Sequence, residues 1–600
     1  MNNRLMSKLL LVALGVMQFL IVPIFSSQSM GGKVAFFSLV VILLTLIMLW
    51  QQSEWLLPWA LIPLVGLVLT SIVSLSVSTL PGIGVVDLGT LAAGGLLCLL
   101  VANLAQEENV LLEWMFRWLQ ILGVIMAALC LYQYLDWVLA GTKTTTLIPY
   151  LLPPGNQRVN GVYGQPNLTA LFLVLSMISF LRAYSTHKNP LNGWRGPFLG
   201  VGFLFVVSAF FLTGSRSGLV AFFVVIFILV CWQIRGRLQF PRRSLITIFL
   251  LIVLGFLFSK LPLSPEITSV GFSRPELSTD ARFIYWVSSV LIWLRSPFVG
   301  VGLDHFKLFL PSYAPQAHDI LGFVNFDAMG YTNWAHNEYL QTLAEAGIAG
   351  FVFLLAFVIM LLRNSLSLKS SNGANDSLYF LFLLILSFLI QGMFSWTFRH
   401  PALLFVFFLI AGIVLSKSPG VCFKARFSGR VLVTLSLLAT FPVIGYISCQ
   451  QYRFVQLKLM AKEHGCASAS ILSAMNDPYL GFDMMREVLP ICVSDAAFFK
   501  NRPLVEDFKP YFVKISDLQG TYSQWYNLGL VYRSLGDYPR AEAALKKAVE
   551  RQPVFELGWS VLHALHAEEA SRKTGRPLAD FLPSEKTHSV DFYDSFFKRH

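Results

Sequence analysis

Residues 34–50 read VAFFSLVVILLTLIMLW, and residues 244–258 read SLITIFLLIVLGFLF. Neither run contains a charged residue, and similar runs recur along most of the chain. A helix needs about 20 mostly apolar residues to cross the hydrocarbon core of a bilayer. Of the 600 residues, 55% are hydrophobic and only 13% are charged, well below the charged fraction of soluble proteins. This composition excludes a single soluble globule, a disordered chain and a fibrous repeat, and it predicts a polytopic membrane protein.

The apolar runs define the predicted fold class. Runs of spanning length occur at 5–25, 34–50, 55–79, 83–104, 110–139, 166–184, 198–213, 217–234, 244–260, 348–363, 378–396, 401–416 and 430–448. The first run follows Arg4 and Lys8, but no small-residue cleavage site comes after it, so we expect a retained helix and not a signal peptide. The prediction is an all-α, polytopic integral membrane protein with about 13 transmembrane helices and a C-terminal extramembrane helical domain.

The basic residues indicate the orientation of the chain. The formal net charge of +12 would suggest a nucleic-acid partner in a soluble protein. Here lysines and arginines cluster in the loops at 182–196, 233–243, 363–377 and 417–430, as is typical of cytoplasmic loops. We therefore predict no nucleic-acid partner and a cytoplasmic N-terminus, which places the C-terminal domain outside, in the periplasm if the cell is Gram-negative.

The same topology divides the chain into segments. They are transmembrane helices at 1–139, an external loop at 140–165, transmembrane helices at 166–260, a large external loop at 261–347, transmembrane helices at 348–448, and an external domain at 449–600. All three polar segments lie outside, where there is no ATP, so an activated substrate must bring its own energy. Cys466 and Cys492 both lie in the external tail, where disulfides persist. The sequence leaves open whether these two cysteines pair.

The tail contains one helical repeat. Residues 522–555 follow the W-x2-L-G-x2-Y…A-x3-F…P pattern of a tetratricopeptide repeat, with Trp525 and Tyr532 in the aromatic positions and Leu545 in the Phe position. One helical pair cannot bury its own face, so we expect helices near 452–475, 480–490 and 556–574 to complete a short stack. The repeat is either a structural cap or a concave surface that holds an acceptor protein.

The first polar cluster is RVNGVYGQPN at 158–167. Its glycines permit a tight loop, and Pro166 suits the first turn of the next membrane helix. A helix N-terminus favours anions, so Arg158, Gln165 and Asn167 are predicted to line a phosphate or sugar site. A plain loop with a helix cap is the alternative.

The second cluster is TGSRSG at 213–218, a very short turn between two apolar runs. Arg216 is therefore expected at or slightly within the membrane surface. Guanidinium groups bind phosphate oxygens in a fork, which favours a pyrophosphate clamp. Snorkelling to lipid phosphates is the alternative.

The third cluster lies in the external segment 261–347. Arg282 is expected to head an amphipathic helix on the membrane surface, because apolar residues recur after it at helical spacing. His336 precedes a second predicted helix, which Gly347 ends as a C-cap. A lone histidine beside a helix start is more often structural, but an external histidine near two membrane-level arginines combines a base with a pyrophosphate clamp.

Several site types find no support in the sequence. The chain has no H-E-x-x-H or C-x-x-C spacing, no P-loop, no G-x-S-x-G motif and no G-x-G-x-x-G motif after a strand. We therefore predict no cofactor and no metal site, and no ATP-driven, serine-hydrolase or nicotinamide chemistry.

Together these motifs resemble the O-antigen ligase and polymerase superfamily. The resemblance rests on GSRSG at 214–218, DAR…W at 280–286, SPFVGVG at 296–302 and HNEYLQ…EAG at 336–347. Within the superfamily, the 158–167 segment and the helical tail are similar to the bacterial O-linked protein oligosaccharyltransferases of the PglL type.

The resemblance implies a glycosyltransferase. Its donor would be a glycan on undecaprenyl pyrophosphate, and its acceptor a Ser or Thr hydroxyl of a pilin or periplasmic protein. Arg216 and Arg282 would bind the pyrophosphate, and His336 would orient or deprotonate the hydroxyl. The other predicted site residues are Arg158, Gln165, Asn167 and Arg399 for the donor, and Tyr339, Trp525 and Tyr532 for the acceptor.

Two alternatives remain open at this point. The acceptor could instead be the lipid A core or a growing polysaccharide, and only the tail and the 158–167 segment favour protein. A transporter of lipid-linked oligosaccharide belongs to another class. It should line a central path with charges on several helices, whereas Arg216, Arg282, His336 and Arg399 are predicted at one membrane face.

Overall fold

The computed structural model describes residues 3–19, 30–52, 54–106, 110–140, 158–186, 195–238, 240–259, 277–324, 330–367, 375–424 and 427–580. The chain forms two compact units. The first unit comprises Met1–Ser74, Val85–Arg274 and His336–Cys449, and the second comprises Leu75–Gly84, Pro275–Ala335 and Gln450–His600. Each unit is described by itself below.

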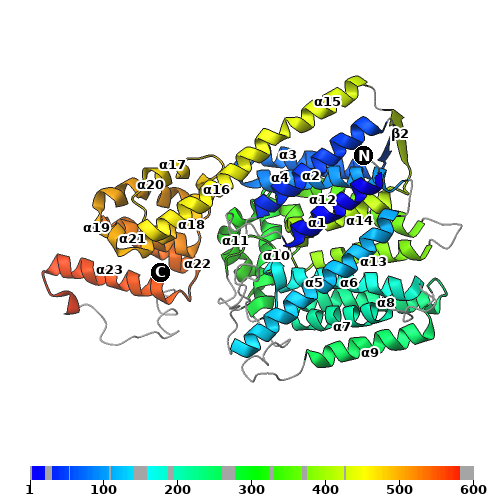
Figure 1. Cartoon of the computed structure of the whole chain (residues 1–600). Helices are drawn as coiled ribbons and strands as arrows, with labels where there is room; N and C mark the ends of the chain where they lie inside the picture. Colours follow the sequence, from blue (N-terminus) through cyan, green and yellow to red (C-terminus); the bar gives the residue numbers. More distant parts are fainter. Residues whose placement is uncertain are drawn as a thin grey trace. The chain divides into compact units, whose positions relative to one another are not determined.

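The first unit is built almost entirely from apolar helices (Figure 1). They are α1 (Asn3–Phe19), α2 (Met30–Gln51), α3 (Leu61–Ser76), α4 (Val85–Leu104), α5 (Val110–Ala140), α6 (Pro166–Thr186), α7 (Arg195–Leu212), α8 (Arg216–Ile234), α9 (Arg242–Phe258), α12 (Glu338–Ser367), α13 (Asn375–Gly392), α14 (Pro401–Leu415) and α15 (Phe427–Leu438), with short 3-10 turns η2 (Gly161–Tyr163) and η4 (Thr397–Arg399). Helix α16 (Thr440–His464) begins in the first unit and continues into the second.

Helix α14 forms the core of the first unit. Every one of its residues is buried, and it packs against α1, α2, α4, α12 and α13. Among its ring contacts, the ring centroids of Phe405 and Phe37 lie 4.7 Å apart, and those of Phe407 and Phe388 lie 5.4 Å apart. A helix that is hydrophobic on all sides is stable only when it is surrounded by apolar groups.

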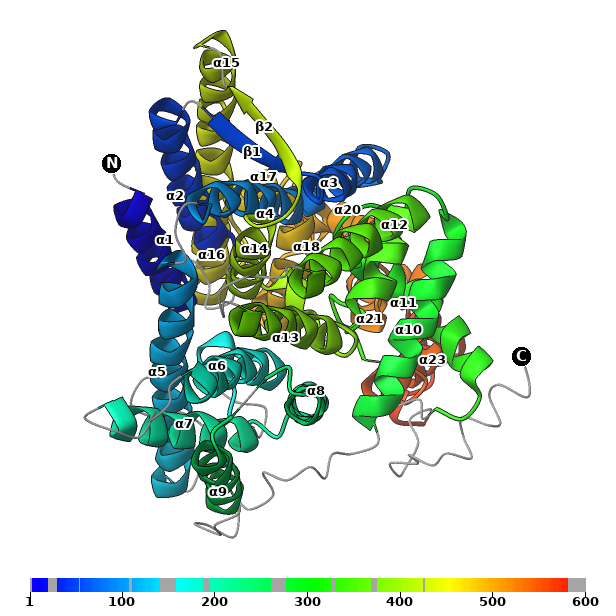
Figure 2. The same cartoon turned by 90° about the vertical axis from the view of Figure 1, so that its right-hand side faces the viewer.

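Helices α5, α6, α7 and α9 lie side by side in a second layer of the first unit (Figure 2). Large apolar side chains are exposed on α9 and on α8, which packs against α6: Phe249 of α9 is 66% exposed and Phe227 of α8 is 67% exposed. Exposed apolar faces of this extent mark a surface that lies against lipid or another protein.

Each of the predicted membrane runs contains helix. Among the described residues, seven helices are long and apolar enough to cross a membrane, and four shorter apolar helices accompany them. The all-α membrane fold is therefore confirmed, whereas the count of thirteen crossings stays a prediction.

The predicted span at 55–79 is interrupted at its start. Strand β1 (Glu54–Pro58) pairs antiparallel with β2 (Gly420–Lys424), with Leu56 opposite Cys422, and α3 begins only at Leu61. The side chain of Asn103 forms two hydrogen bonds with the backbone of Leu56, of 2.8 and 3.0 Å. Backbone groups need partners when they are shielded from water, and this side chain supplies them.

The region after His336 follows the prediction at Gly347. A first helical segment of α12 ends at Gly347, which has the non-helical angles φ 66° and ψ −172°, and a second helical segment continues beyond this kink. Glycine adopts this conformation without a steric penalty. The kink separates a first helical segment at 338–346 from the longer apolar segment that follows.

The second unit joins part of the predicted external loop to the tail. Its helices are η1 (Pro81–Gly84), α10 (Leu277–Arg295), α11 (Phe306–Leu321), α17 (Ala469–Met475), α18 (Gly481–Ser494), α19 (Ala496–Lys500), α20 (Arg502–Leu518), α21 (Tyr522–Ser534), α22 (Tyr538–Arg551), α23 (Glu556–Thr574) and η5 (Leu578–Asp580). Leu308 of α11 belongs to the same hydrophobic core as Phe482 and Phe512 of the tail. Gln519 of the tail also donates to the carbonyl oxygen of Lys307 over 3.0 Å. The predicted segment 261–347 is thus divided, because Pro275–Ala335 belongs to the same unit as the tail, whereas His336 belongs to the first unit.

The predicted helical repeat is present as the hairpin of α21 and α22. Gly529 lets the helices approach closely, since a Cβ atom there would lie 2.7 Å from Cγ of Leu545. Gly536, with φ 80°, and the N-cap Asp537 form the turn, as predicted. The flanking helices were also predicted, apart from α19 and α20.

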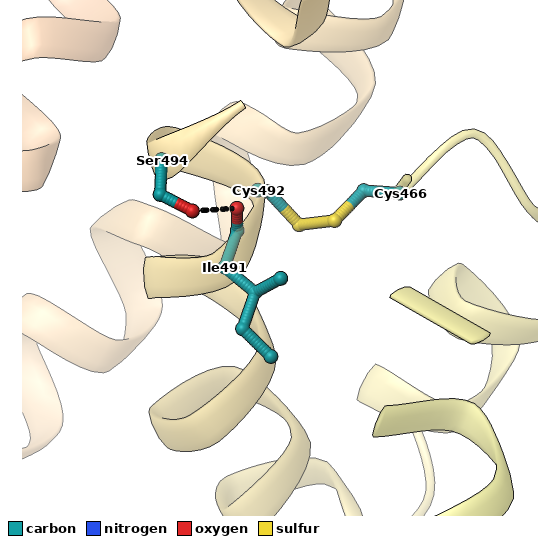
Figure 3. The surroundings of a disulfide bond; sticks show 4 residues. All are labelled: Cys466, Ile491, Cys492 and Ser494. Carbon is teal, nitrogen blue, oxygen red and sulfur yellow. Dashed lines mark hydrogen bonds between the residues drawn. A yellow bond between two sulfur atoms is a disulfide. The ribbon is translucent and has the colours of Figure 1, made fainter. Parts of the chain in front are cut away.

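Cys466 and Cys492 form a disulfide that links the segment after α16 to α18 (Figure 3). Next to it, the Ser494 hydroxyl donates a 2.7 Å hydrogen bond to the carbonyl oxygen of Ile491. This answers the question that the sequence left open.

Candidate active site

The first two predicted clusters meet in the first unit. The guanidinium Nη1 of Arg158 donates to the carbonyl oxygens of Gly214 and Thr213, over 3.1 and 3.5 Å. The Ser215 hydroxyl donates to Oδ1 of Asn167 over 2.8 Å. Segments that the sequence separates by about fifty positions therefore form one polar site. It combines the loop before α6 with the turn before α8.

Arg216 is the first residue of α8 and its side chain is exposed. Ser215 caps this helix by accepting a hydrogen bond from the backbone N–H of Gly218, and the first turn of α8 contains no acidic residue. The N-terminus of a helix carries partial positive charge, so an arginine there is favourable chiefly when an anion binds beside it. With Arg158 against the same turn, the site is suited to a phosphate group.

The other two residues of the 158–167 segment hold the helices in place. Asn167 is buried, and its carbonyl oxygen accepts a 2.7 Å hydrogen bond from the side chain of Gln391 in α13. The half-buried Gln165 precedes α6, and its carbonyl oxygen accepts from the N–H groups of Leu168 and Thr169. Asn167 thus links α6 to α8 and α13, so the structure gives it a bracing role beside the predicted donor site.

His336 lies immediately before the cap of α12. The cap is Asn337, whose side-chain oxygen accepts hydrogen bonds from the backbone N–H groups of Tyr339 and Leu340, both over 3.1 Å. His336 has φ 54°, a left-handed conformation that is uncommon outside glycine. Such a conformation costs roughly 1–3 kcal/mol and persists only where the surroundings enforce it. Strained residues of this kind concentrate at functional sites.

Tyr339, predicted to contact the acceptor, is anchored within the first unit. Its hydroxyl donates a 3.0 Å hydrogen bond to the carbonyl oxygen of Leu389 in α13. The side chain is half-buried. Tyr339 therefore ties α12 to α13, and this contact must be kept or exchanged if the hydroxyl also serves a substrate.

Arg399 has a different environment from the one predicted. Its Nη1 lies 2.9 Å from a carboxylate oxygen of Asp87, its Nε 3.6 Å from Glu338 and its Nη2 2.7 Å from Glu345. We call Arg399 and these three carboxylates the Arg399 cluster. The side chain of Arg399 is 10% exposed, that of Glu345 0% and that of Glu338 2%. Because three acids already surround it, Arg399 is a poor site for a pyrophosphate, which corrects its predicted donor role.

The pKa shifts in the loop before α14 agree with the pairing of Arg399 with acids. Burial opposes the charge of Arg399, but Glu345, Asp87 and Glu338 outweigh that effect and raise its pKa above the ordinary value. Burial, together with the nearby Lys33, lowers the pKa of His400 to about 3. His400 is therefore a weak base in the folded protein, which leaves His336 as the better-suited histidine.

Arg282 lies in the second unit, in the second turn of α10, and is half-buried. Arg216 and His336 lie in the first unit, so the predicted clamp draws its two arginines from different units. The predicted apolar face of α10 packs in part against α11, and Ile284 is fully buried.

The two predicted acceptor contacts of the tail differ from each other. Trp525 is 9% exposed and belongs to the core of the second unit, with Nζ of Lys547 4.1 Å from its ring centroid. Its predicted role as a contact residue is therefore corrected, because a buried ring offers no face to a partner. Tyr532 is half-buried, with the guanidinium of Arg540 5.9 Å from its ring.

The predicted site left out the acids of the Arg399 cluster. Glu338 and Glu345 are seven positions apart, so they lie on one face of a helix, and Gln341 lies between them on the same face. This spacing within HNEYLQTLAE was a usable signal for paired acids. Asp87 gave no comparable signal, since it lies near the start of another helix.

The comparisons with known proteins cover both units. Residues 201–355 match the O-antigen ligase family model, and this range contains Arg216, Arg282 and His336. Residues 522–555 match the tetratricopeptide repeat model, which confirms the predicted repeat. A search of curated proteins found no match to the chain.

The family match covers the turn before α8, the helix of Arg282 and the first part of α12. These are the segments on which the resemblance to the superfamily rested, while the narrower PglL-type assignment stays a prediction. The match of residues 201–355 to the O-antigen ligase family model supports the assignment of this part of the chain to the O-antigen ligase superfamily.

Proposed function

We propose that the chain transfers an oligosaccharide en bloc from undecaprenyl pyrophosphate to Ser or Thr hydroxyls of an external protein. The family match indicates a lipid-linked glycan transferase in a membrane. The finer assignment rests mainly on one observation. The exposed Arg216 heads α8 beside Arg158, within a site formed by the 158–167 segment.

The donor would bind through its pyrophosphate. Arg216 provides a guanidinium group for the phosphate oxygens, and the N-terminus of α8 adds backbone N–H groups. The family resemblance alone supports the same role for Arg282. These contacts strengthen as negative charge grows on the leaving group. The positive groups at this site are supplied by the chain itself, and the proposed reaction uses no cofactor.

The reaction is a displacement at the anomeric carbon. The acceptor oxygen forms a bond to this carbon while the bond to the pyrophosphate oxygen breaks, and undecaprenyl pyrophosphate leaves with the electron pair. His336 accepts the hydroxyl proton, because a neutral imidazole nitrogen can act as a general base. Direct attack inverts the configuration of the sugar.

The acceptor assignment rests on the second unit. A helical repeat is a common protein-binding element, and here it shares a core with the segment that carries α10 and α11. The disulfide of Cys466 and Cys492 supports an external tail, because such bonds persist outside the cytoplasm. We therefore propose the inner membrane with a cytoplasmic N-terminus, a periplasmic tail and a pilin or periplasmic acceptor.

Co-expression tests this function directly. The chain is produced with a lipid-linked glycan pathway and candidate periplasmic or pilin proteins, and the intact masses of those proteins are measured. A mass increase equal to the whole glycan is expected, and it should disappear with Arg216→Ala. Glycan found only on the lipid A core or in a longer polysaccharide would instead assign another acceptor.

A further inference from the structure

We propose that the Arg399 cluster is a positioning device that fixes His336 in its strained conformation. The inference rests on the proposed function only in treating His336 as the group that meets the acceptor hydroxyl. It gives Arg399, Glu338, Glu345 and Asp87 a role that neither the family match nor the sequence motifs supply.

The cluster fixes the chain two residues after His336. Oε1 of Glu338 accepts the backbone N–H of Phe398 over 2.7 Å, and its Oε2 lies 3.6 Å from Nε of Arg399. Glu338 is therefore bound to the η4 turn through both carboxylate oxygens. The start of α12 cannot shift relative to η4 without breaking these contacts.

A second anchor lies two helical turns further on. The carboxylate of Glu345 meets Nη2 of Arg399 over 2.7 Å and accepts from Gln341 over 3.1 Å. The carbonyl oxygen of Glu345 accepts from the Ser74 hydroxyl of α3 over 2.5 Å. Both ends of the 338–346 segment are thus tied to other parts of the first unit.

This segment needs such anchors. The kink at Gly347 separates it from the rest of α12, and a helix of so few residues is only marginally stable by itself. It must nevertheless hold His336 at φ 54° against the local steric preference. External contacts therefore have to supply the rigidity, and the Arg399 cluster supplies them.

Arginine is suited to this task because its planar group presents several donors in fixed directions. Nη1, Nε and Nη2 of Arg399 each face a different carboxylate, from α4 and from two turns of α12. A lysine ammonium is a single point charge and cannot hold three acids in this arrangement. Charge alone is therefore insufficient at position 399.

The test compares two substitutions that alter the cluster with little change in volume. Glu345→Gln removes one buried carboxylate, and Arg399→Lys keeps the positive charge but loses the planar group. Each variant is purified as the full chain and assayed for transfer to a protein acceptor. Hydrogen exchange of residues 336–346 is measured on the same samples.

Both variants should lower kcat about 10²-fold, the loss typical of a group displaced by about 1 Å, while the KM for the donor stays unchanged. Exchange in residues 336–346 should be faster. Asp87→Asn should have the smallest effect, because Asp87 is 27% exposed and contacts the cluster from its edge.

The matched control is another ion pair of the first unit. Arg182 of α6 pairs bidentately with Glu113 of α5, and the Arg182 side chain is 9% exposed. Glu113→Gln breaks this pair and should leave kcat and the exchange of residues 336–346 unchanged. If the loss of turnover came only from a general loss of stability, the control and the cluster variants would be affected alike.

Two results would overturn the proposal. One is unchanged exchange of residues 336–346 in Glu345→Gln and Arg399→Lys. The other is a donor KM that rises in parallel with the loss of turnover, which would return Arg399 to donor binding. If the wild-type chain modifies no protein, the proposed function fails, and the exchange measurement alone then decides whether the cluster fixes this segment.

Discussion

Arg216 and Arg399 are both arginines of the first unit next to helix starts, yet their surroundings are opposite. Arg216 is exposed at the head of α8, whose first turn has no acid. Arg399 is buried among three carboxylates from α4 and α12. The comparison teaches that the partners of a guanidinium decide its role. A guanidinium exposed at a helix N-terminus is accessible to an anionic ligand, whereas one buried among acids stabilises the protein itself.

The largest effect is expected at Arg216. Arg216→Ala should reduce transfer about 10²–10³-fold, because it removes donors that stabilise the leaving group. Arg216→Lys should lose most activity as well, since an ammonium cannot form a bidentate phosphate contact. Transfer rates are measured at equal amounts of membrane protein. Wild-type rates in both variants would show that Arg216 takes no part in donor binding.

Removal of the guanidinium of Arg399 is expected to lower the stability of the protein, which the Arg216 substitutions should leave unchanged. Arg399→Ala leaves Glu338 and Glu345 buried without their counter-charge, and breaking a buried ion pair typically destabilises by about 3–5 kcal/mol. The measurement is thermal unfolding of the detergent-solubilised chain. Arg216→Ala is the control and should unfold near the wild-type temperature. Equal stability of the two variants would remove the distinction between these arginines.

A smaller effect is expected at the cap beside Arg216. Ser215→Ala loses the N-cap hydrogen bond to Gly218 and the contact with Asn167, which should cost about 0.5–2 kcal/mol of stability. Thermal unfolding measures the loss. Restoring the cap with Ser215→Thr should recover most of it. If the alanine variant is as stable as wild type, the polar site before α8 is not braced in this way.

The smallest effect is expected in the tail, at Tyr532, which is predicted to contact the acceptor. Tyr532→Ala should raise the KM for a protein acceptor about fivefold, equivalent to about 1 kcal/mol, and leave the KM for the donor unchanged. Tyr538 packs against the same hydrophobic cluster of the hairpin and provides the control. If Tyr538→Ala has the same effect on acceptor KM, Tyr532 acts through packing and not through contact with the acceptor.

Local features of the fold could be predicted because their causes are local. Apolar runs form helices since lipid offers no hydrogen-bond partners to the backbone, so each helix must satisfy its own. The repeat hairpin followed from the positions of Gly529 and Leu545, and the turn from Gly536. The strand pair of β1 and β2 was missed, because its two segments lie far apart in the sequence and neither has a distinctive pattern.

In the candidate site, too, features with local causes could be predicted, whereas contacts between distant segments could not. The sequence by itself determined Arg216 at a helix start and His336 before another, because caps and tight turns depend on neighbouring residues. Only the tertiary structure decided that Arg399 meets Asp87, 312 positions away, and that Trp525 is buried. Attraction between charges depends on their separation in space, and burial depends on which surfaces pack together. Neither the separation of the charges nor the burial can be computed from the order of residues, so only the fold distinguished the surroundings of Arg399 from those of Arg216.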